Sequence, residues 1–194
     1  LKGPCENSVF WDDAAQKLKN HRGHLVVSVV GELAPIPLVT LLTQVTASIV
    51  GTATGVQGVY WKNANLVVPP EIFRHFATEV MPDAPPMPIW VDTCVGINPE
   101  GYTCGYTTGM ESLGFMEIEA TSSSDLPKEL RQRFHGLAYY LVENGPIIQD
   151  GDMLGQTDNE QIRISYSDSA FGRTGQVIRL NYMTIKRRKK GWFG

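Results

Sequence analysis

Residues 102–120 read YTCGYTTGMESLGFMEIEA, and this stretch says most about the fold. Its two ends read as β-strands on either side of a glycine-rich connection. Glu117 and Glu119 are two residues apart, so both carboxylates should project from one face of the second strand, with Ile118 and Ala120 on the opposite, buried face. The stretch therefore predicts a hairpin-like pair of strands whose polar face is open to solvent or to a partner.

Strands and helices intermingle on both sides of this hairpin. Apolar residues at helical spacing predict helices within residues 10–20, 38–49, 70–80 and 125–145. Strand-like runs occupy residues 24–30, 56–60, 66–68, 89–95, 161–166 and 176–183. The run His24–Val30 is so rich in β-branched residues that we expect a strand buried on both faces. Without a regular βαβ alternation, these elements predict an α+β fold: a mixed, mainly antiparallel sheet with helices packed on one face.

The chain of 194 residues suits one substantial domain. We expect a single α+β domain over residues 1–185 and a basic tail over residues 186–194. The tail holds five of the 17 basic residues, at positions 186–190, so the rest carries 12 basic against 20 acidic residues, a net charge of −8. Such an acidic surface should repel nucleic acid and anionic membranes over most of its area. The tail reads as a solubilising chain end, with attachment to nucleic acid or lipid as the alternative.

The distribution of apolar residues and of cysteines indicates the cellular compartment that suits the protein. We find no apolar run near the roughly 20 residues that cross a bilayer. Three cysteines, Cys5, Cys94 and Cys104, do not make a disulfide framework, and no Cys-x-x-Cys spacing suggests zinc. Buried free thiols in a reducing compartment are the simpler interpretation. We therefore predict a cytoplasmic protein.

The motifs of the common enzyme classes are missing. Neither glycine-rich phosphate motif occurs, nor does a serine nucleophile elbow. His21 and His24 lack a third ligand at a recognisable spacing. We predict no catalytic residue, no metal and no cofactor. The remaining candidates form a partner-binding face along the hairpin: Thr107, Thr108, Glu111, Glu117 and Glu119.

The glycines and hydroxyls between Gly101 and Gly114 leave a second interpretation open. A glycine-rich loop can present backbone N–H groups to an anion, so this region could hold a phosphate in an enzyme with an unrecognised site. Glycine and threonine are also what a twisted hairpin needs, which is the simpler explanation.

Several short segments, taken in order, resemble a bacterial family catalogued as a domain of unknown function, number 4261. They are residues 3–8 (GPCENS), 21–28 (HRGHLVVS), 58–61 (GVYW) and 107–114 (TTGMESLG). The likeness continues through residues 150–155 (DGDMLG) to the last strand, so it spans nearly the whole chain. It implies a bacterial source and supplies no catalytic residues to carry over.

Residues 108–117 (TGMESLGFME) are also faintly similar to a turn and strand of the suppressor-of-fused superfamily. Bacterial members of that superfamily are often implicated as immunity proteins against polymorphic toxins, which for this chain is an analogy of fold. Together with the acidic body and the missing catalytic motifs, this likeness leads us to expect a non-enzymatic factor that binds another protein, immunity-like or accessory in kind. The anion-binding enzyme is the alternative.

Overall fold

The structure is a computed structural model that describes residues 2–6, 8–155 and 161–183. The basic run at positions 186–190 lies outside the described residues, and its role stays a prediction. Contacts divide the chain into two compact units. Unit 1 is Leu1–Asp92 with Thr108–Gly114, and unit 2 is Thr93–Thr107 with Phe115–Gly194. The expectation that residues 1–185 fold as a single domain also stays a prediction.

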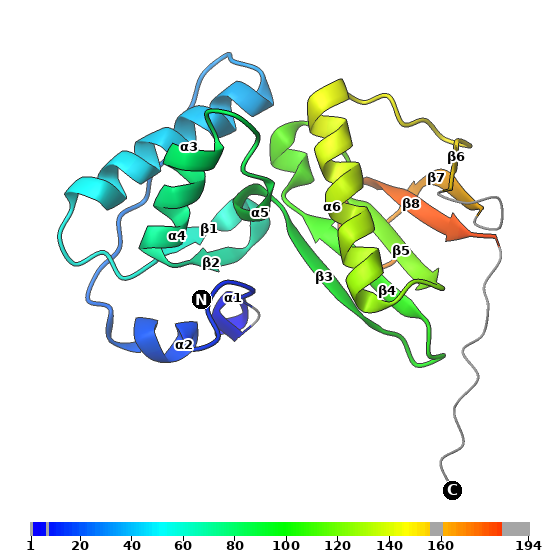
Figure 1. The fold of residues 1–194 in the computed structure, drawn as a ribbon, viewed down its shortest axis with the longest axis horizontal. Coiled ribbons are helices and arrows are strands. Elements are labelled where there is room, and N and C mark those ends of the chain that lie inside the picture. The colour runs from blue at the N-terminus through cyan, green and yellow to red at the C-terminus, as the bar shows by residue number, and fades with distance from the viewer. Residues whose placement is uncertain (1, 7, 156–160, 184–194) are drawn as a thin grey trace, which may run out of the picture. The chain divides into compact units, whose positions relative to one another are not determined.

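Unit 1 consists of helices and a small two-stranded sheet (Figure 1). Its helices are α1 (Lys2–Glu6), α2 (Ala14–Lys17), α3 (Pro35–Thr52), α4 (Pro70–His75), the π-helical η3 (Phe76–Val80) and α5 (Met87–Trp90). Single 3₁₀ turns are η1 (Leu18–Asn20), η2 (Lys62–Ala64) and η4 (Met110–Leu113). The antiparallel strands are β1 (Val59–Trp61) and β2 (Leu66–Val68). Asn65 closes the turn between them at φ 56°, a conformation that asparagine tolerates better than most residues.

Unit 2 is a six-stranded sheet with the long helix α6 (Pro127–Asn144) across one face (Figure 1). The strands are β3 (Asp92–Ile97), β4 (Thr103–Thr108), β5 (Ile118–Ser123), β6 (Met153–Leu154), β7 (Ile162–Asp168) and β8 (Gln176–Tyr182). They lie in the order β3-β4-β5-β8-β7-β6. The β5–β8 pair is parallel, whereas β4–β5, β6–β7 and β7–β8 are antiparallel. The predicted α+β fold with a mixed, mainly antiparallel sheet is confirmed.

Helix α6 forms where the sequence predicts it. Glu129 accepts a hydrogen bond from the N–H of Leu126 at 2.7 Å, which satisfies one of the free donors at the start of the helix. The apolar stripe is buried at four positions: Leu130, Phe134, Ala138 and Leu141. Just before the helix, Asp125 accepts hydrogen bonds from Arg133 at 2.9 Å and from the Tyr182 hydroxyl at 2.7 Å. These contacts fix the first turns of α6 over strand β8.

The prediction of a doubly buried strand at His24–Val30 is wrong. These residues belong to neither helix nor strand, and Leu25, Val26 and Val30 are 70%, 77% and 95% exposed. A β-branched run is competent to form a strand, but it becomes one only beside a second strand that accepts its hydrogen bonds. Among the described residues, none takes that place.

Helix α3 qualifies the expectation about membrane segments. Among the described residues it is the one helix that is long and apolar enough to cross a bilayer, judged by length and composition alone. Only 22% of the span is buried, and it packs through Val39, Thr43, Thr46 and Ala47. Thr43 accepts a hydrogen bond from the indole N–H of Trp90 at 2.9 Å. These contacts account for α3 as a helix of unit 1, so its apolar composition is weak evidence for a membrane span.

His135 on α6 gives unit 2 a predictable response to pH. Burial, reinforced by the charge of Arg131, lowers the pKa of His135. The unfolded chain therefore takes up this proton first, and the free energy of unfolding should fall as the pH drops below the ordinary histidine pKa of about 6.5. We expect His135→Gln to flatten that decline in urea unfolding experiments at a series of pH values. An unchanged slope would show that His135 does not contribute to it.

Candidate functional site

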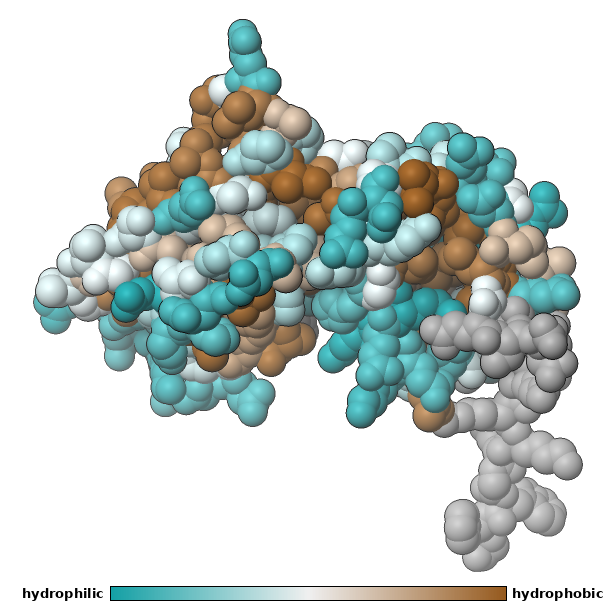
Figure 2. All heavy atoms as spheres, turned by 45° about the horizontal axis from the view of Figure 1, so that its top comes forward, coloured by the Kyte–Doolittle hydropathy of each residue, from teal (hydrophilic) through white to brown (hydrophobic). Residues whose placement is uncertain are grey.

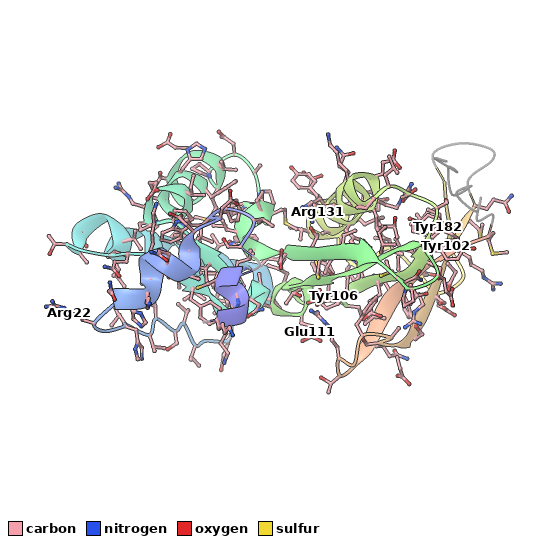
Figure 3. The ribbon with its side chains drawn as sticks, turned by 90° about the horizontal axis from the view of Figure 1, so that it is seen from below. Arg22, Tyr102, Tyr106, Glu111, Arg131 and Tyr182 are labelled. Atoms are coloured by element: carbon pink, nitrogen blue, oxygen red, sulfur yellow. The ribbon has the colours of Figure 1, made fainter. Side chains whose placement is uncertain are left out.

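The candidate site lies on the face of the unit 2 sheet that α6 does not cover, called the open face below. Tyr106 pairs with Glu119 across β4 and β5, and Glu119 pairs with Arg179 across β5 and β8. Residues paired in this way share a face, whereas Gly105 and Ala120 form the neighbouring pair on the α6 side. Figure 3 shows Tyr106 on the side of the sheet away from Arg131 of α6. The three strands thus bring aromatic, acidic and basic side chains to the open face.

The expectation that Glu117 and Glu119 face solvent is wrong. Glu117 is 4% exposed and Glu119 is fully buried. The reason is the β7–β8 turn, residues 169–175, which hydrogen-bonds to Glu119 and covers it. Spacing along a strand predicts that two side chains share a face, but only the packing of a distant segment decides whether that face is exposed to solvent.

Glu119 holds the β7–β8 turn in place. Its carboxylate accepts hydrogen bonds from the Ser169 hydroxyl and from the N–H of Ala170, the latter at 2.9 Å. Arg179 completes a buried ion pair with the same carboxylate at 3.4 Å. The Ser169 oxygen in turn accepts from the backbone N–H of Arg173 at 3.3 Å. One buried carboxylate therefore organises the start of the turn.

Glu117 and Thr107 form a second set of hydrogen bonds, which holds the side chain of Arg173 in the same β7–β8 turn. The Thr107 hydroxyl donates to the Glu117 carboxylate at 2.6 Å and accepts from the N–H of Ile118 at 2.8 Å. The carbonyl oxygen of Thr107 accepts a hydrogen bond from the Arg173 guanidinium at 2.6 Å. Arg173 is thus fixed twice, by its backbone through Ser169 and by its side chain on Thr107.

The structure brings together three of the five predicted residues, Thr107, Glu117 and Glu119, all in unit 2. Thr108 is half-buried at the end of β4, and Glu111 is exposed on η4. Both of these belong to unit 1. The predicted set is therefore split between the two units.

Sequence reasoning missed the part of the site that reaches the surface. The Arg173 guanidinium lies 4.3 Å from the centre of the Tyr106 ring, within the range of a cation–π contact. The rings of Tyr106 and Phe171 lie 5.0 Å apart at 52°. All three residues are half-buried. Phe171 and Arg173 come from a glycine-rich turn about 65 residues after Tyr106, and the only local signal was an aromatic and an arginine within a turn sequence.

Two thiols adjoin this cluster on the neighbouring strands β3 and β4. A hydrogen bond with Cys94, together with burial, raises the pKa of Tyr106, and Arg173 opposes the shift. Burial, and to a lesser extent Cys94, raises the pKa of Cys104. A raised pKa keeps the Cys104 thiol protonated, which is the opposite of what a catalytic nucleophile needs.

The glycines and hydroxyls between residues 101 and 114 serve the fold. Thr103 donates to the carbonyl oxygen of Asp125 at 2.5 Å, and Ser112 donates to that of Gly109 at 2.7 Å. Thr107 is engaged with Glu117, whose carboxylate would also repel an anion placed beside it. In the part of the chain that the structure describes, no three His, Cys, Asp or Glu side chains gather as a metal would need. Nothing in this geometry favours the phosphate-binding alternative.

This part of the chain is similar to a known protein family. Residues 106–181 match the model of the family described as Domain of unknown function (DUF4261). The matched range begins at Tyr106 and includes both carboxylates, the β7–β8 turn and Arg179, so the open-face network lies inside it. The resembling segments at residues 3–8, 21–28 and 58–61 lie outside the matched range.

No curated protein and no solved structure matches the chain. The faint likeness to the suppressor-of-fused superfamily therefore stays a prediction.

Proposed function

We propose that the protein is a non-enzymatic factor that binds another protein, immunity-like or accessory in kind, in the bacterial cytoplasm. Its contact surface is the stack of Tyr106, Phe171 and Arg173 on the open face of unit 2. The observation that carries the proposal is this half-exposed arginine–aromatic stack, fixed from below by two buried carboxylates.

The composition of the stack suits a protein contact. Tyrosine and arginine are the residues that most often dominate the binding energy of protein interfaces, because they offer a large area together with directed hydrogen bonds. Here the tyrosine ring is packed against Phe171, and the guanidinium is held by Thr107. Side chains that are already ordered lose little conformational entropy on binding, which favours affinity. The guanidinium directs the stack toward an acidic or aromatic group of the partner.

The buried network below the stack is hard to explain by stability alone. A buried ion pair such as Glu119–Arg179 contributes little net stability compared with an apolar pair of similar size. Two buried polar atoms of this face, Ser167 Oγ and Arg179 Nε, have no hydrogen-bond partner among the described residues. Such groups are uncommon in folded proteins and cost free energy. Their presence fits a network that positions the β7–β8 turn for binding, so Glu117 and Glu119 act as supports and not as direct contacts.

Affinity capture from a lysate of the source cell tests the proposal. We compare the wild type with Tyr106→Ala, Arg173→Ala and the control Tyr140→Ala, a 46% exposed tyrosine on α6. A stoichiometric partner should remain on the wild type and on the control. Each stack variant should bind it roughly 30-fold more weakly, as expected for a hot-spot residue worth about 2 kcal/mol.

The variants must retain the wild-type melting temperature within a few degrees for the comparison to count. A partner that stays bound to both stack variants, or that is lost equally from Tyr140→Ala, would contradict the proposed surface.

A cytoplasmic location also suits the three cysteines, which are all unpaired.

A further inference from the structure

The exposed segment of unit 1 has an internal symmetry. Residues 22–32 read RGHLVVSVVGE, and position 27 is their centre. Counting outward from Val27, Arg22 corresponds to Glu32 and Gly23 corresponds to Gly31. Everything between the two glycines is uncharged when histidine is neutral. The segment therefore carries opposite charges at equal distances from the centre of an apolar, β-branched run.

The backbone of this segment is available for pairing. Within the described residues, none from Arg22 to Leu33 takes part in a hydrogen bond or an ion pair. Several of its apolar side chains are also among the most exposed of the chain. Figure 2 shows hydrophobic residues gathered over this side of unit 1, around α3. An unpaired, apolar and strand-competent segment without proline is a template for a further strand.

We propose that residues 22–32 pair in antiparallel register with the same residues of a second copy of the chain, with Val27 of each copy on the two-fold axis. In this register Arg22 of each copy lies opposite Glu32 of the other, so the pairing gains two ion pairs and places no like charges together. A parallel alignment would instead place Arg22 beside Arg22 and Glu32 beside Glu32. The charges therefore favour a closed, two-fold symmetric dimer.

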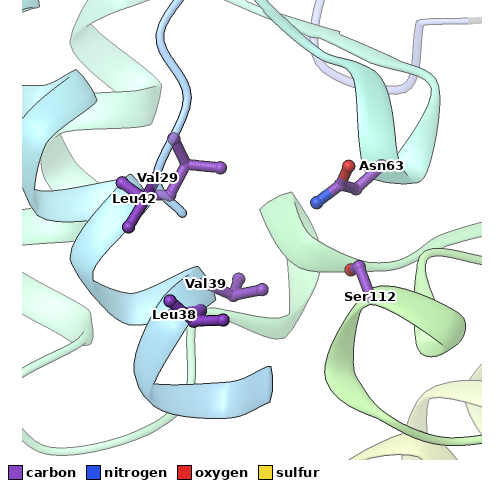
Figure 4. A pocket seen from close by; sticks show the side chains of 6 residues that line it. All are labelled: Val29, Leu38, Val39, Leu42, Asn63 and Ser112. Atoms are coloured by element: carbon purple, nitrogen blue, oxygen red, sulfur yellow. The ribbon is translucent and has the colours of Figure 1, made fainter. Parts of the chain in front are cut away.

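A hollow beside the segment fits this arrangement. Val29, Leu38, Val39 and Leu42 line one side of it, and Asn63 and Ser112 line the other (Figure 4). The hollow measures about 180 Å³, which is space for an aliphatic side chain. In the proposed register, Leu25 of the second copy lies opposite Val29 and on the same face. That leucine fills the hollow, which gives the two-stranded ribbon the apolar support that an isolated pair of strands lacks.

Sedimentation of the full chain over a range of protein concentrations tests the proposal, because the charges can be exchanged without disturbing the fold. Arg22→Glu and Glu32→Arg each turn two attractive pairs into repulsive ones. At low salt each change should raise the dimer dissociation constant about tenfold. The double variant Arg22→Glu/Glu32→Arg restores opposite charges and should return to nearly the wild-type value. The differences should shrink as salt is raised.

A second variant tests the apolar contact. Leu25→Asp should leave the protein monomeric, whereas Ile147→Asp, at an exposed apolar position of unit 2, should dimerise as the wild type does. A wild type that stays monomeric at every soluble concentration would overturn the proposal. So would a double variant no tighter than the single ones, or assembly that continues beyond the dimer. Residues 22–32 belong to unit 1, whereas Tyr106, Phe171 and Arg173 belong to unit 2, so monomeric variants should still capture the proposed partner.

Discussion

Replacing Glu119 with alanine should lower the free energy of unfolding by about 4 kcal/mol, since removing one member of a buried ion pair leaves the other charge without compensation. Arg179 would keep a charge beside the buried core, and the Ser169 hydroxyl and the Ala170 N–H would lose their acceptor. The loss should appear in urea unfolding as a lower midpoint with little change in slope.

The matched control is Glu100→Ala, because Glu100 is an exposed glutamate of the same unit. We expect a change within about 0.5 kcal/mol there, as for most surface positions. Glu119→Gln should fall between the two, since the amide keeps the shape and one acceptor oxygen but not the charge. Equal stability of Glu119→Ala and Glu100→Ala would show that the buried carboxylate does not hold the β7–β8 turn.

Replacing Gly109 with alanine should be equally damaging, for a reason of space. Gly109 has φ 118°, and a Cβ atom added there would lie 2.2 Å from the carbonyl oxygen of Trp90. That oxygen belongs to the backbone, next to a fully buried tryptophan, so it cannot move aside as a flexible side chain would. We expect a loss of about 4 kcal/mol or failure to fold, both visible in the melting temperature and the soluble yield.

Gly55→Ala separates the effect of space from the effect of backbone conformation. Gly55 also lies in unit 1 with a positive φ, 77°, but nothing stands within 4 Å of its added Cβ. The left-handed conformation alone should cost about 1 kcal/mol. Similar losses for Gly55→Ala and Gly109→Ala would mean that the close approach to Trp90 is unimportant.

These two predictions also divide the roles of the hairpin between structure and function. Gly109 lets the chain pass close to α5 in unit 1, whereas Glu119 organises the turn that carries Phe171 and Arg173 in unit 2. On the proposed function, loss of Glu119 should therefore weaken partner capture although the side chain itself is buried. The sequence singled out Glu119, but it could not tell that this carboxylate is buried and holds a distant turn.

Two elements of unit 2 were predictable from a local pattern. The alternation around Ile118 and Ala120 and the helical stripe from Leu130 to Leu141 lead directly to β5 and α6. The same reasoning failed for His24–Val30. Residue types there are suited to a strand, but a strand exists only as a pair, and the pairing partner is not encoded in the segment itself.

The candidate site was predictable only in part. Thr107, Glu117 and Glu119 could be placed near one another because they lie within a few residues of a hairpin. Tyr106 lies in the same hairpin, yet nothing in the sequence pairs it with Phe171 and Arg173 of a distant turn. Contacts over such separations depend on strand order, here on β8 lying beside β5.

By itself, the sequence determined the class of fold, the strand and helix that flank the open face, and the side of β5 to which Glu119 belongs. These follow from periods of two and 3.6 residues, which are properties of the backbone over a few positions. Only the tertiary structure decided that the carboxylates are buried supports, that Tyr106 meets Phe171 and Arg173, and that residues 24–30 remain unpaired. Burial and pairing are relations between segments distant in the chain, so they exist only once the strands have taken their order.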